Sequence, residues 1–339
     1  MLDLRPLFAS LAAPPPSSSG LPLFTAVELP GAGGFRIARD VSNRAVLLID
    51  ASGQGQANPA PYVLEHLRIE HARACTVRHN DGSETPGLFT LVSCTSTDVV
   101  LREYFLLVLG TLIANSGLPP TSQTTSDAIA TIVELFRSLQ APPRKSVQGL
   151  WSELFLIAEA RHPTILLRAW HATPGDRYDF NLGTARLEVK SVAGAVRHHH
   201  FSLAQLSPTG GTTALVASLF IERAGGGTSL AELMDEVRTR VARSTDLLVR
   251  METVVAATLG SALQASLSER FDRDLARSSL AYVRLEDVPR IDATPPPAVT
   301  DVRFTSDLRG VPCADLDAIA RERASEFFAA LAPGMSGLA

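Results

Sequence analysis

Three residues near the middle of the sequence combine types and spacing from which a hydrolytic metal site can be built. The stretch DRYDFNLGTARLEVKSV, residues 176–192, contains Asp179, Glu188 and Lys190. YDFNL and RLEVKSV have the composition of two short strands, and the tight turn NLGT between them predicts a hairpin. Residues i and i+2 of a strand point to the same face, about 6.6 Å apart at roughly 3.3 Å per residue. Glu188 and Lys190 are therefore expected side by side, and the hairpin should bring Asp179 close to Glu188.

The two carboxylates predict a divalent cation. At about 4 Å they would repel each other by roughly 1 kcal/mol in water and by up to about 4 kcal/mol in a half-buried cleft. A metal ion removes this cost, and hard oxygen ligands suit Mg²⁺ or Mn²⁺. Such an ion lowers the pKa of a bound water and stabilises charge that develops on phosphate oxygens. We therefore predict Asp179 and Glu188 as ligands of Mg²⁺ (or Mn²⁺).

Lys190 is one of only two lysines in a chain that otherwise uses arginine for its basic positions. An ammonium is a compact donor whose pKa shifts readily on burial, whereas a guanidinium stays charged. A lysine can therefore orient the attacking water or help to deprotonate it. The alternative for Asp179, Glu188 and Lys190 is a cross-strand salt bridge on a solvated face.

A further acidic candidate comes from the segment GLWSELFLIAEA, which predicts a largely buried helix. Glu153 falls on the same helical stripe as Leu150 and Ile157, where a carboxylate is costly unless it has a partner. We predict that Glu153 belongs to the site. A buried structural ion pair is the alternative.

Three polar residues after the second strand are candidates for contacts with a substrate. Ser202 and Gln205 fit a capping box that opens a short helix over SLAQL. Arg197 and His200 precede this expected helix start, which favours anions, and they are predicted to contact a phosphate group. Gln205 is also predicted to line the site, although capping alone would explain it. The other two histidines of the HHH run are expected in a solvated loop.

This pattern resembles the PD-(D/E)XK nuclease superfamily, with Asp179 as the aspartate and Glu188 and Lys190 as the E-x-K. The proline of the motif name is absent, and Tyr178 precedes the aspartate, a departure common in this degenerate superfamily. The resemblance implies an α/β, restriction-endonuclease-like core of helix, three-stranded sheet, helix and strand. It also implies hydrolysis of a phosphodiester that leaves a 5′-phosphate. The order predicted from the sequence, helix, strand, strand, helix, strand, agrees with such a core.

A narrower resemblance covers roughly the whole chain. GLWSELFL, DF, EVKS and RHHHFSLAQL, within residues 149–206, are similar to a bacterial family of PD-(D/E)XK motif proteins found among restriction and phage-defence genes. In that resemblance Glu153 supplies an acidic residue from the first core helix, and the segment from Arg197 through His200 to Gln205 lines the site. The resemblance implies a role in restriction or phage defence, beside a methyltransferase or ATPase subunit.

The remaining sequence predicts the domain organisation. Residues 1–20 are expected to form a flexible lead-in. Residues 21–120 contain short apolar runs separated by glycine, proline and asparagine, which is typical of a β-rich N-terminal domain. One helix is expected near residues 61–72, and a buried helix at the end of this domain. Residues 121–339 are expected to form the nuclease-like domain and to close with a single helix over DLDAIARERASEFFAALA.

Composition limits the setting and the partners. Three widely separated cysteines provide neither a complete disulfide framework nor a CxxC metal site, which favours a reducing, cytoplasmic setting. The sequence contains no secretory leader and no run of 18 apolar residues, so no membrane insertion is expected. The formal net charge is -4, so a surface for DNA must be a local one.

These features together predict a Mg²⁺-dependent deoxyribonuclease. A catalytically silent interaction or DNA-binding subunit of a defence complex, which keeps the nuclease fold, is the main alternative, and metal affinity separates the two. An enzyme acting on a small phosphate ester is a third option. A homodimer also stays open, although no coiled-coil heptad marks an interface.

Overall fold

The computed structural model describes residues 2–17, 20–51, 60–116, 121–171, 175–208, 210–292, 295–296 and 298–332. The chain divides into two compact units. The first comprises Met1–Pro142 with Gly260–Gln264, and the second comprises Pro143–Leu259 with Ala265–Ala339. Both contain helices and sheets, so the expected mixed α/β class is confirmed.

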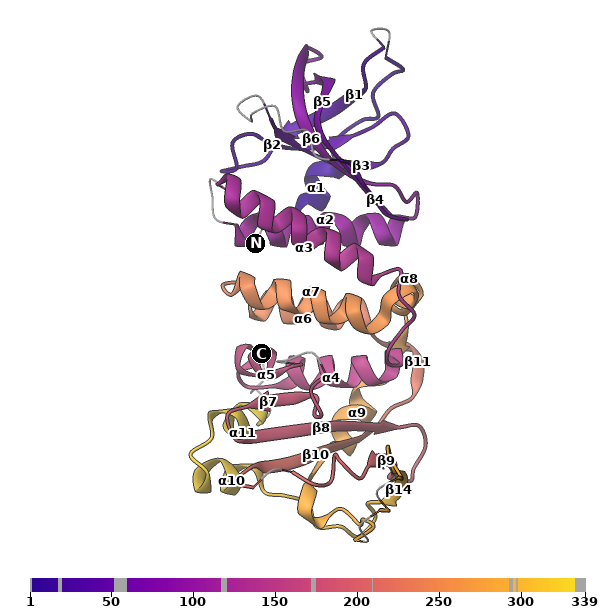
Figure 1. The fold of residues 1–339 in the computed structure, drawn as a ribbon, viewed down its shortest axis with the longest axis vertical. Helices are drawn as coiled ribbons and strands as arrows, with labels where there is room; N and C mark the ends of the chain where they lie inside the picture. The colour runs from indigo at the N-terminus through magenta and orange to yellow at the C-terminus, as the bar shows by residue number, and fades with distance from the viewer. Residues whose placement is uncertain are drawn as a thin grey trace. The chain divides into compact units, whose positions relative to one another are not determined.

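A closed sheet forms the centre of the first unit (Figure 1). Its strands pair in the order β1-β2-β3-β6-β5, and β5 pairs with β1 again, in parallel. A sixth strand, β4, pairs with β5. The bounds are β1 (Leu23–Glu28), β2 (Phe35–Arg39), β3 (Ala45–Asp50), β4 (Tyr62–Val63), β5 (Leu67–Arg78) and β6 (Glu84–Cys94).

The helix expected near residues 61–72 is not formed, because this segment belongs to β4 and β5. At the start of β5, Leu67 and Ile69 are buried whereas Arg68 between them is exposed. That period of two is the pattern of a strand with one buried face.

The described part of the first unit also contains the helices α1 (Leu4–Ala9), α2 (Val99–Asn115) and α3 (Ser122–Ser138), and the 3-10 helix η1 (Gly260–Ala262). The buried helix expected after the β-rich segment is α2, and nearly all of its central residues are buried. The short helix α1 differs from the expected flexible lead-in over residues 1–20. Asp3 caps it by accepting from the backbone N–H of Arg5, and Leu4 and Phe8 are buried. This burial holds the segment in place.

The second unit is built on a four-stranded sheet with the order β13-β10-β8-β7. β7 and β8 form the expected antiparallel hairpin, and β10 lies parallel to β8. Gly183 adopts a φ of 54° in the connecting turn, a conformation that glycine adopts without strain. Two two-stranded ladders, β9 with β14 and β11 with β12, lie outside this sheet. The bounds are β7 (Phe180–Leu182), β8 (Ala185–Val192), β9 (His198–Ser202), β10 (Thr213–Phe220), β11 (Arg223–Ser229), β12 (Arg270–Phe271), β13 (Ala281–Arg284) and β14 (Arg303–Asp307).

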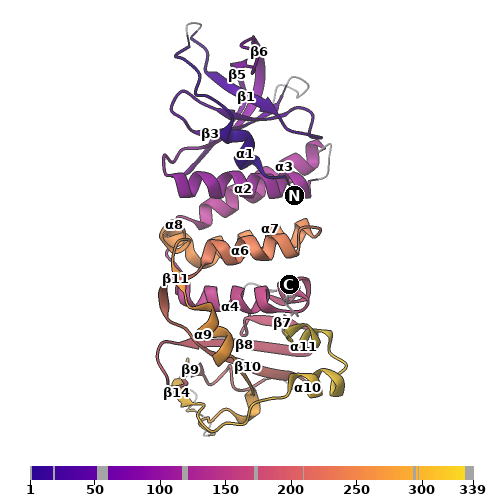
Figure 2. The ribbon, with the colours of Figure 1, turned by 180° about the vertical axis from the view of Figure 1, so that it is seen from behind.

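Helices cover this sheet in layers (Figures 1 and 2). α4 lies along β8, α6 and α7 pack on α4, and α9 packs on β10. The closing helix is in fact two helices, α10 and α11, separated near Ala324, whose φ is 46°. The helical bounds are α4 (Val147–Glu159), α5 (Pro163–Ala169), α6 (Leu230–Arg240), α7 (Thr245–Leu259), α9 (Arg273–Ser279), α10 (Leu316–Glu322) and α11 (Glu326–Leu331); η1 (Gly260–Ala262) and α8 (Leu263–Ser266) follow α7 in the chain, and η2 (Leu285–Asp287) follows β13.

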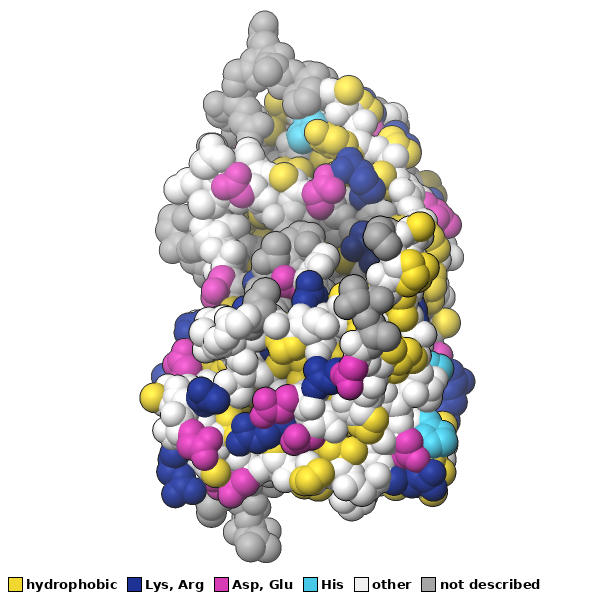
Figure 3. All heavy atoms as spheres, turned by 60° about the horizontal axis from the view of Figure 1, so that its bottom comes forward, with side chains coloured by type: hydrophobic (Ala, Val, Ile, Leu, Met, Phe, Trp, Pro, Cys, Tyr) yellow, Lys and Arg dark blue, Asp and Glu magenta, His cyan; other side chains and the backbone are white. Residues whose placement is uncertain are grey.

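The surface carries charges of both signs. Figure 3 shows acidic and basic side chains interspersed over the face in view, without a broad region of one sign. Within the part of the chain that the structure describes, none of the helices has the length and apolarity that a membrane-spanning helix needs.

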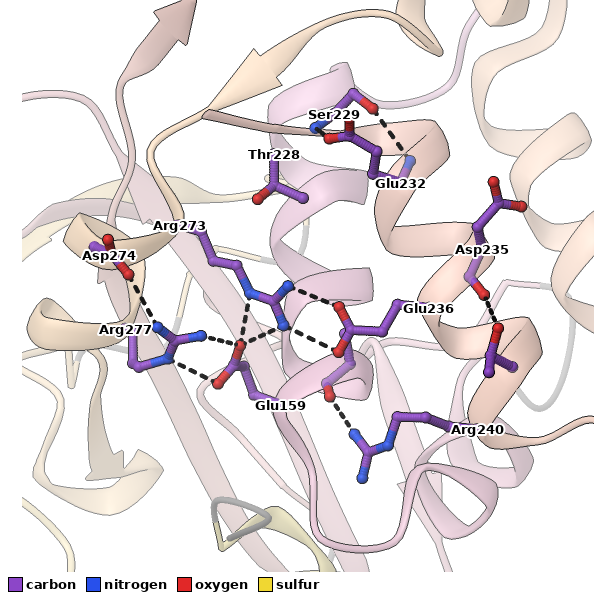
Figure 4. A network of polar contacts seen from close by, with 12 residues as sticks. Glu159, Thr228, Ser229, Glu232, Asp235, Glu236, Arg240, Arg273, Asp274 and Arg277 are labelled. Carbon is purple, nitrogen blue, oxygen red and sulfur yellow. Dashed lines mark hydrogen bonds and ion pairs between the residues drawn. The ribbon is translucent and has the colours of Figure 1, made fainter. Parts of the chain in front are cut away.

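An ionic network fixes α4 within the second unit (Figure 4). The guanidinium of Arg273 in α9 donates to Glu159 at the end of α4 and to Glu236 in α6, at 2.8 and 2.7 Å. Arg277, one turn further along α9, donates to the same Glu159 carboxylate at 2.9 and 2.8 Å. Three helices are thereby tied together at the C-terminal end of α4.

We expect Arg238→Met to lower the free energy of unfolding by about 3–5 kcal/mol, because it leaves a buried carboxylate without its partner. Arg238 of α6 donates to Glu252 Oε1 of α7 at 3.0 and 2.7 Å, and the two side chains are 4% and 1% exposed. Urea unfolding measures the change. The matched control is Arg303→Met in the exposed pair with Asp301, for which a loss below about 1 kcal/mol is expected. Equal losses for both variants would contradict the argument.

Candidate functional site

The hairpin brings Asp179 and Glu188 together as its spacing predicts. Phe180 pairs with Leu187, so Asp179 and Glu188 are the next residues at the same end of the ladder. Asp179 lies just before β7, and its Oδ2 accepts the backbone N–H of Val189 at 2.8 Å. The Asp179 carboxylate thus accepts a backbone N–H of β8 that lies beyond the end of the β7–β8 ladder. Both side chains are buried.

Glu188 is incompletely satisfied for a buried carboxylate. Its Oε1 accepts from Lys190 Nζ at 2.7 Å and from Gln205 Nε2 at 2.8 Å. Its Oε2 is buried and has no hydrogen-bond partner among the described residues. Burial and the neighbouring Asp179 charge raise the pKa of Glu188 to about 8, even though Lys190 lies beside it. The charge of Lys190 therefore does not outweigh burial and the repulsion from Asp179, and added positive charge would stabilise the ionised form of Glu188.

Lys190 is held between Glu188 and an aromatic ring. Its Nζ lies 5.1 Å from the ring centroid of Phe201 on β9, within the range of a cation–π contact. Gln205 is also positioned by several contacts. Its backbone carbonyl accepts from the hydroxyl of Tyr178 at 2.7 Å, so the residue before Asp179 helps to aim Gln205 at Glu188.

Glu153 reaches the same place from α4. Its Oε1 accepts from Lys145 Nζ at 2.7 Å, and its Oε2 accepts from Trp170 Nε1 at 2.7 Å and lies 2.9 Å from His171 Nε2. Burial alone would raise the pKa of this carboxyl. The hydrogen bond with His171 and the charge of Lys145 outweigh burial and lower the pKa to about 2. Glu153 is thus an ionised, fully partnered carboxylate.

Lys145 bridges Glu153 and Asp179. Its Nζ lies 2.6 Å from Asp179 Oδ1, in addition to its contact with Glu153. Lys145 belongs to the segment that precedes α4, next to the N-cap residue Ser146. Burial and the Glu153 charge nevertheless raise the pKa of Asp179. Lys145 is the second of the two lysines in the chain, so both lysines lie at this one site.

His171 adds a nitrogen to the cluster. It follows α5 in the left-handed backbone region, with a φ of 42°, and its backbone N–H donates to the carbonyl of Asp179 at 2.9 Å. Such strain in a residue other than glycine persists only where the surroundings enforce it and is common at functional sites. Glu153, His171 and Asp179 offer ligand atoms that all lie within 4.8 Å of one another. This set has the chemistry to hold a divalent metal.

Five of the seven predicted site residues are connected by these contacts: Glu153, Asp179, Glu188, Lys190 and Gln205. The other two, Arg197 and His200, form their hydrogen bonds with residues outside this cluster.

Arg197 donates to the backbone carbonyl and the hydroxyl of Ser218, at 2.8 and 2.6 Å, and to the carbonyl of Ser279. His200 is exposed, and its Nδ1 lies 3.0 Å from Thr305 Oγ1 on β14. Because alternate residues of a strand point to opposite faces, His200 points away from the side on which Phe201 meets Lys190.

The helix expected over SLAQL is a turn. Ser202 and Gln205 do make the two reciprocal hydrogen bonds of a capping box, at 3.0 and 3.1 Å. Pro208 and the glycines that follow leave too few residues for a helix. The expected helix N-terminus beside Arg197 and His200 is therefore absent.

The expectation of a solvated loop is wrong for His199. His199 belongs to β9, which pairs with β14. Because side chains alternate along a strand, His199 points inward, where its Nε2 lies 2.7 Å from Ser218 Oγ. Burial and the nearby charge of Lys190 lower the pKa of His199 from 6.5 to about 4.

The free energy of unfolding should therefore fall as the pH drops from about 6.5 to 4, because the unfolded chain binds a proton there that native His199 does not. The stability that comes from keeping His199 neutral is complete above about pH 6.5. Its full loss, below about pH 4, lowers the free energy of unfolding by about 3 kcal/mol. Urea unfolding at pH 7 and pH 5 should show about 2 kcal/mol of this loss. His199→Gln should flatten the dependence, and the variant His162→Gln, at an exposed position, is the control. Identical slopes for both variants would refute the assignment.

Sequence reasoning missed Lys145 and His171. The rarity of lysine that singles out Lys190 applies equally to Lys145, and this signal could have found it. His171 carries no comparable signal, because its place depends on its own left-handed backbone conformation just after α5.

Comparison with protein families gives one match. The model of the family described as "Putative PD-(D/E)XK family member, (DUF4420)" matches residues 6–309, most of the chain. Neither the curated proteins nor the solved structures contain a match.

Proposed function

The chain belongs to this PD-(D/E)XK family, DUF4420, and from that premise we propose that it is a metal-dependent nuclease that hydrolyses phosphodiester bonds in DNA. The observation that carries the proposal is the arrangement of Asp179, Glu188 and Lys190. Two buried carboxylates lie at the same end of a hairpin. Among the described residues, the only basic group bonded to Glu188 is Lys190, two residues further along β8.

The residues present fit a hard divalent cation. Glu188 has a buried oxygen without a described partner and a raised pKa, so it gains from added positive charge. Asp179 and Glu188, the carboxylates of the motif, would hold the ion, and Glu153 would assist. Glu153, with Asp179 and His171, offers ligand atoms within 4.8 Å of one another. Carboxylate oxygens suit Mg²⁺, while the imidazole of His171 makes Mn²⁺ an equally suitable partner. When bound, such an ion supplies charge stabilisation for a phosphoryl group in transfer.

The chain's own residues perform the remaining tasks. Lys190 donates to the attacking water and orients it, while Gln205 holds Glu188 in position. The water oxygen forms a bond to phosphorus as the bond from phosphorus to the 3′ oxygen breaks. The water gives a proton to solvent, and the 3′ oxygen takes a proton from solvent as it leaves, so that it departs as a hydroxyl. The products are a 5′-phosphate and a 3′-hydroxyl.

The finer biological role rests on the resemblance to restriction and phage-defence proteins. We propose that the nuclease acts in such a system, beside a methyltransferase or an ATPase subunit. One observation favours the alternative, a catalytically silent interaction subunit: the face in Figure 3 has mixed charges, and the net charge is -4. A broad basic surface would be the usual footprint of a DNA-binding protein. The complete set of Asp179, Glu188 and Lys190 favours the enzyme.

Calorimetric titration of Mn²⁺ into the metal-free protein, followed by incubation with supercoiled plasmid, tests the proposal. Saturable binding and nicking that depends on Mg²⁺ or Mn²⁺ are expected, and a chelator should abolish the nicking. Saturable binding with no cleavage of plasmid, linear duplex or single-stranded DNA would favour the silent subunit. Absence of binding at millimolar Mn²⁺ would overturn the metal nuclease.

A further inference from the structure

Lys145 places its ammonium at the position that a cation would take. The Nζ atom lies 2.7 Å from Glu153 Oε1, 2.6 Å from Asp179 Oδ1 and 3.5 Å from His171 Nε2. These are the three residues whose ligand atoms lie within 4.8 Å of one another. A positive charge between two carboxylates compensates the cost of burying them. A divalent ion between the same oxygens would do so too, but it would also repel the ammonium.

The two lysines of the site differ in how firmly they are held. The side chain of Lys145 is 37% exposed, although Glu153 and Asp179 are 3% and 8% exposed. Lys145 therefore enters from the solvent side and can leave in that direction. Lys190 is 19% exposed and lies against the ring of Phe201.

The backbone on both sides of Lys145 is anchored. The N–H of Arg144 donates to the carbonyl of Thr258 at 2.8 Å, and Ser146 Oγ accepts from the N–H of Gly149 at 3.2 Å as the N-cap of α4. Movement of Lys145 can therefore be limited to its flexible four-carbon side chain. Neither α4 nor the hairpin needs to shift when this side chain leaves.

We propose that Lys145 is a built-in counter-ion that competes with the divalent metal for Glu153 and Asp179, and that it swings into solvent when the metal binds. The inference rests on the proposed function and adds a residue outside the PD-(D/E)XK motif. The formal charges agree with it. Lys190 and one divalent ion together neutralise the carboxylates of Glu153, Asp179 and Glu188. Retention of Lys145 would leave one excess positive charge. In the metal-free protein, Lys145 pairs with Glu153 and Asp179.

The two-lysine composition allows a direct test on the unmodified protein. Protein labelled with ¹³C-lysine has two lysine Cε resonances, and Lys145→Met identifies which belongs to position 145. During titration with Mg²⁺, the Lys145 resonance should move to the position of a freely exposed lysine. Its midpoint should coincide with that of the calorimetric binding curve for Mg²⁺.

The affinity for Mg²⁺ provides the second measurement. Lys145→Met should lower the Kd by about tenfold or more, because a positive charge no longer opposes the ion. Arg144→Met removes an equal charge from the exposed neighbouring side chain and should change the Kd by no more than about twofold at 0.15 M salt. Lys145→Gln replaces Lys145→Met if the methionine variant does not fold.

The outcomes distinguish the two proposals. Unchanged Mg²⁺ affinity in Lys145→Met, with a Lys145 resonance that does not move, would overturn the competition but leave the metal site intact. Weaker binding by the variant would likewise overturn it and make Lys145 a supporting residue of the site. Absence of Mg²⁺ binding in both proteins would overturn the competition together with the proposed function.

Discussion

Glu188→Gln is expected to reduce metal-dependent cleavage of DNA by at least about a thousandfold, since a ligand of the ion contributes several kcal/mol to the stabilisation of the transition state. The substitution keeps the shape of the side chain and its contacts with Lys190 and Gln205 on Oε1. It removes the negative charge on the oxygen that has no described partner. Initial rates of plasmid nicking at saturating Mg²⁺ measure the effect.

The same substitution should leave the metal-free protein folded. Burial already disfavours the ionised form of Glu188, so an uncharged amide is expected to change the free energy of unfolding by no more than about 1 kcal/mol. Glu286→Gln, at an exposed position, is the control and should retain full cleavage. If Glu188→Gln kept more than a tenth of the wild-type rate, Glu188 would not be a ligand of the catalytic ion.

Lys190→Arg is expected to lower the cleavage rate by about a hundredfold or more, because the attacking water loses the donor that orients it. Arginine preserves the positive charge beside Glu188, so stability should change little. Its guanidinium is larger and stays charged, and it cannot take the place of the ammonium against both Glu188 and the ring of Phe201.

The separate values of kcat and KM distinguish chemistry from binding. Lys190→Arg should lower kcat and leave the KM for DNA nearly unchanged, because Lys190 orients the attacking water rather than the bound substrate. Arg223→Lys, a basic exchange at an exposed position, should behave as the wild type. A Lys190→Arg variant with the wild-type kcat would reduce Lys190 to a structural counter-ion.

The local part of the site could be predicted from the sequence because its determinants are local. A turn of fixed length places Asp179 opposite Glu188, and strand periodicity places Lys190 beside it. Helical periodicity likewise identifies Glu153, the charged residue on an otherwise apolar stripe. In each case a few consecutive residues determine the direction of a side chain.

The remainder depends on contacts between distant segments. His199 is buried because β9 pairs with a strand about a hundred residues further along the chain, and no local pattern reveals that pairing. The capping-box residues at Ser202 and Gln205 form the expected bonds, but the following proline and glycines stop the helix. Lys145 lies in a segment without periodicity, so only the rarity of lysine in this chain could have identified it.

The closed sheet of the first unit restricts how another protein could recognise that unit. An open sheet offers free backbone N–H and C=O groups along its edge, to which a partner can add a strand. Here β1 and β5 close the sheet through the parallel pairing of Leu23–Thr25 with Thr76–Arg78, and among the described residues the short strand β4 (Tyr62–Val63) keeps a free edge. A protein that binds this closed sheet is therefore expected to recognise mainly side chains and loops, because β1 and β5 offer each other the backbone groups that an added strand would need.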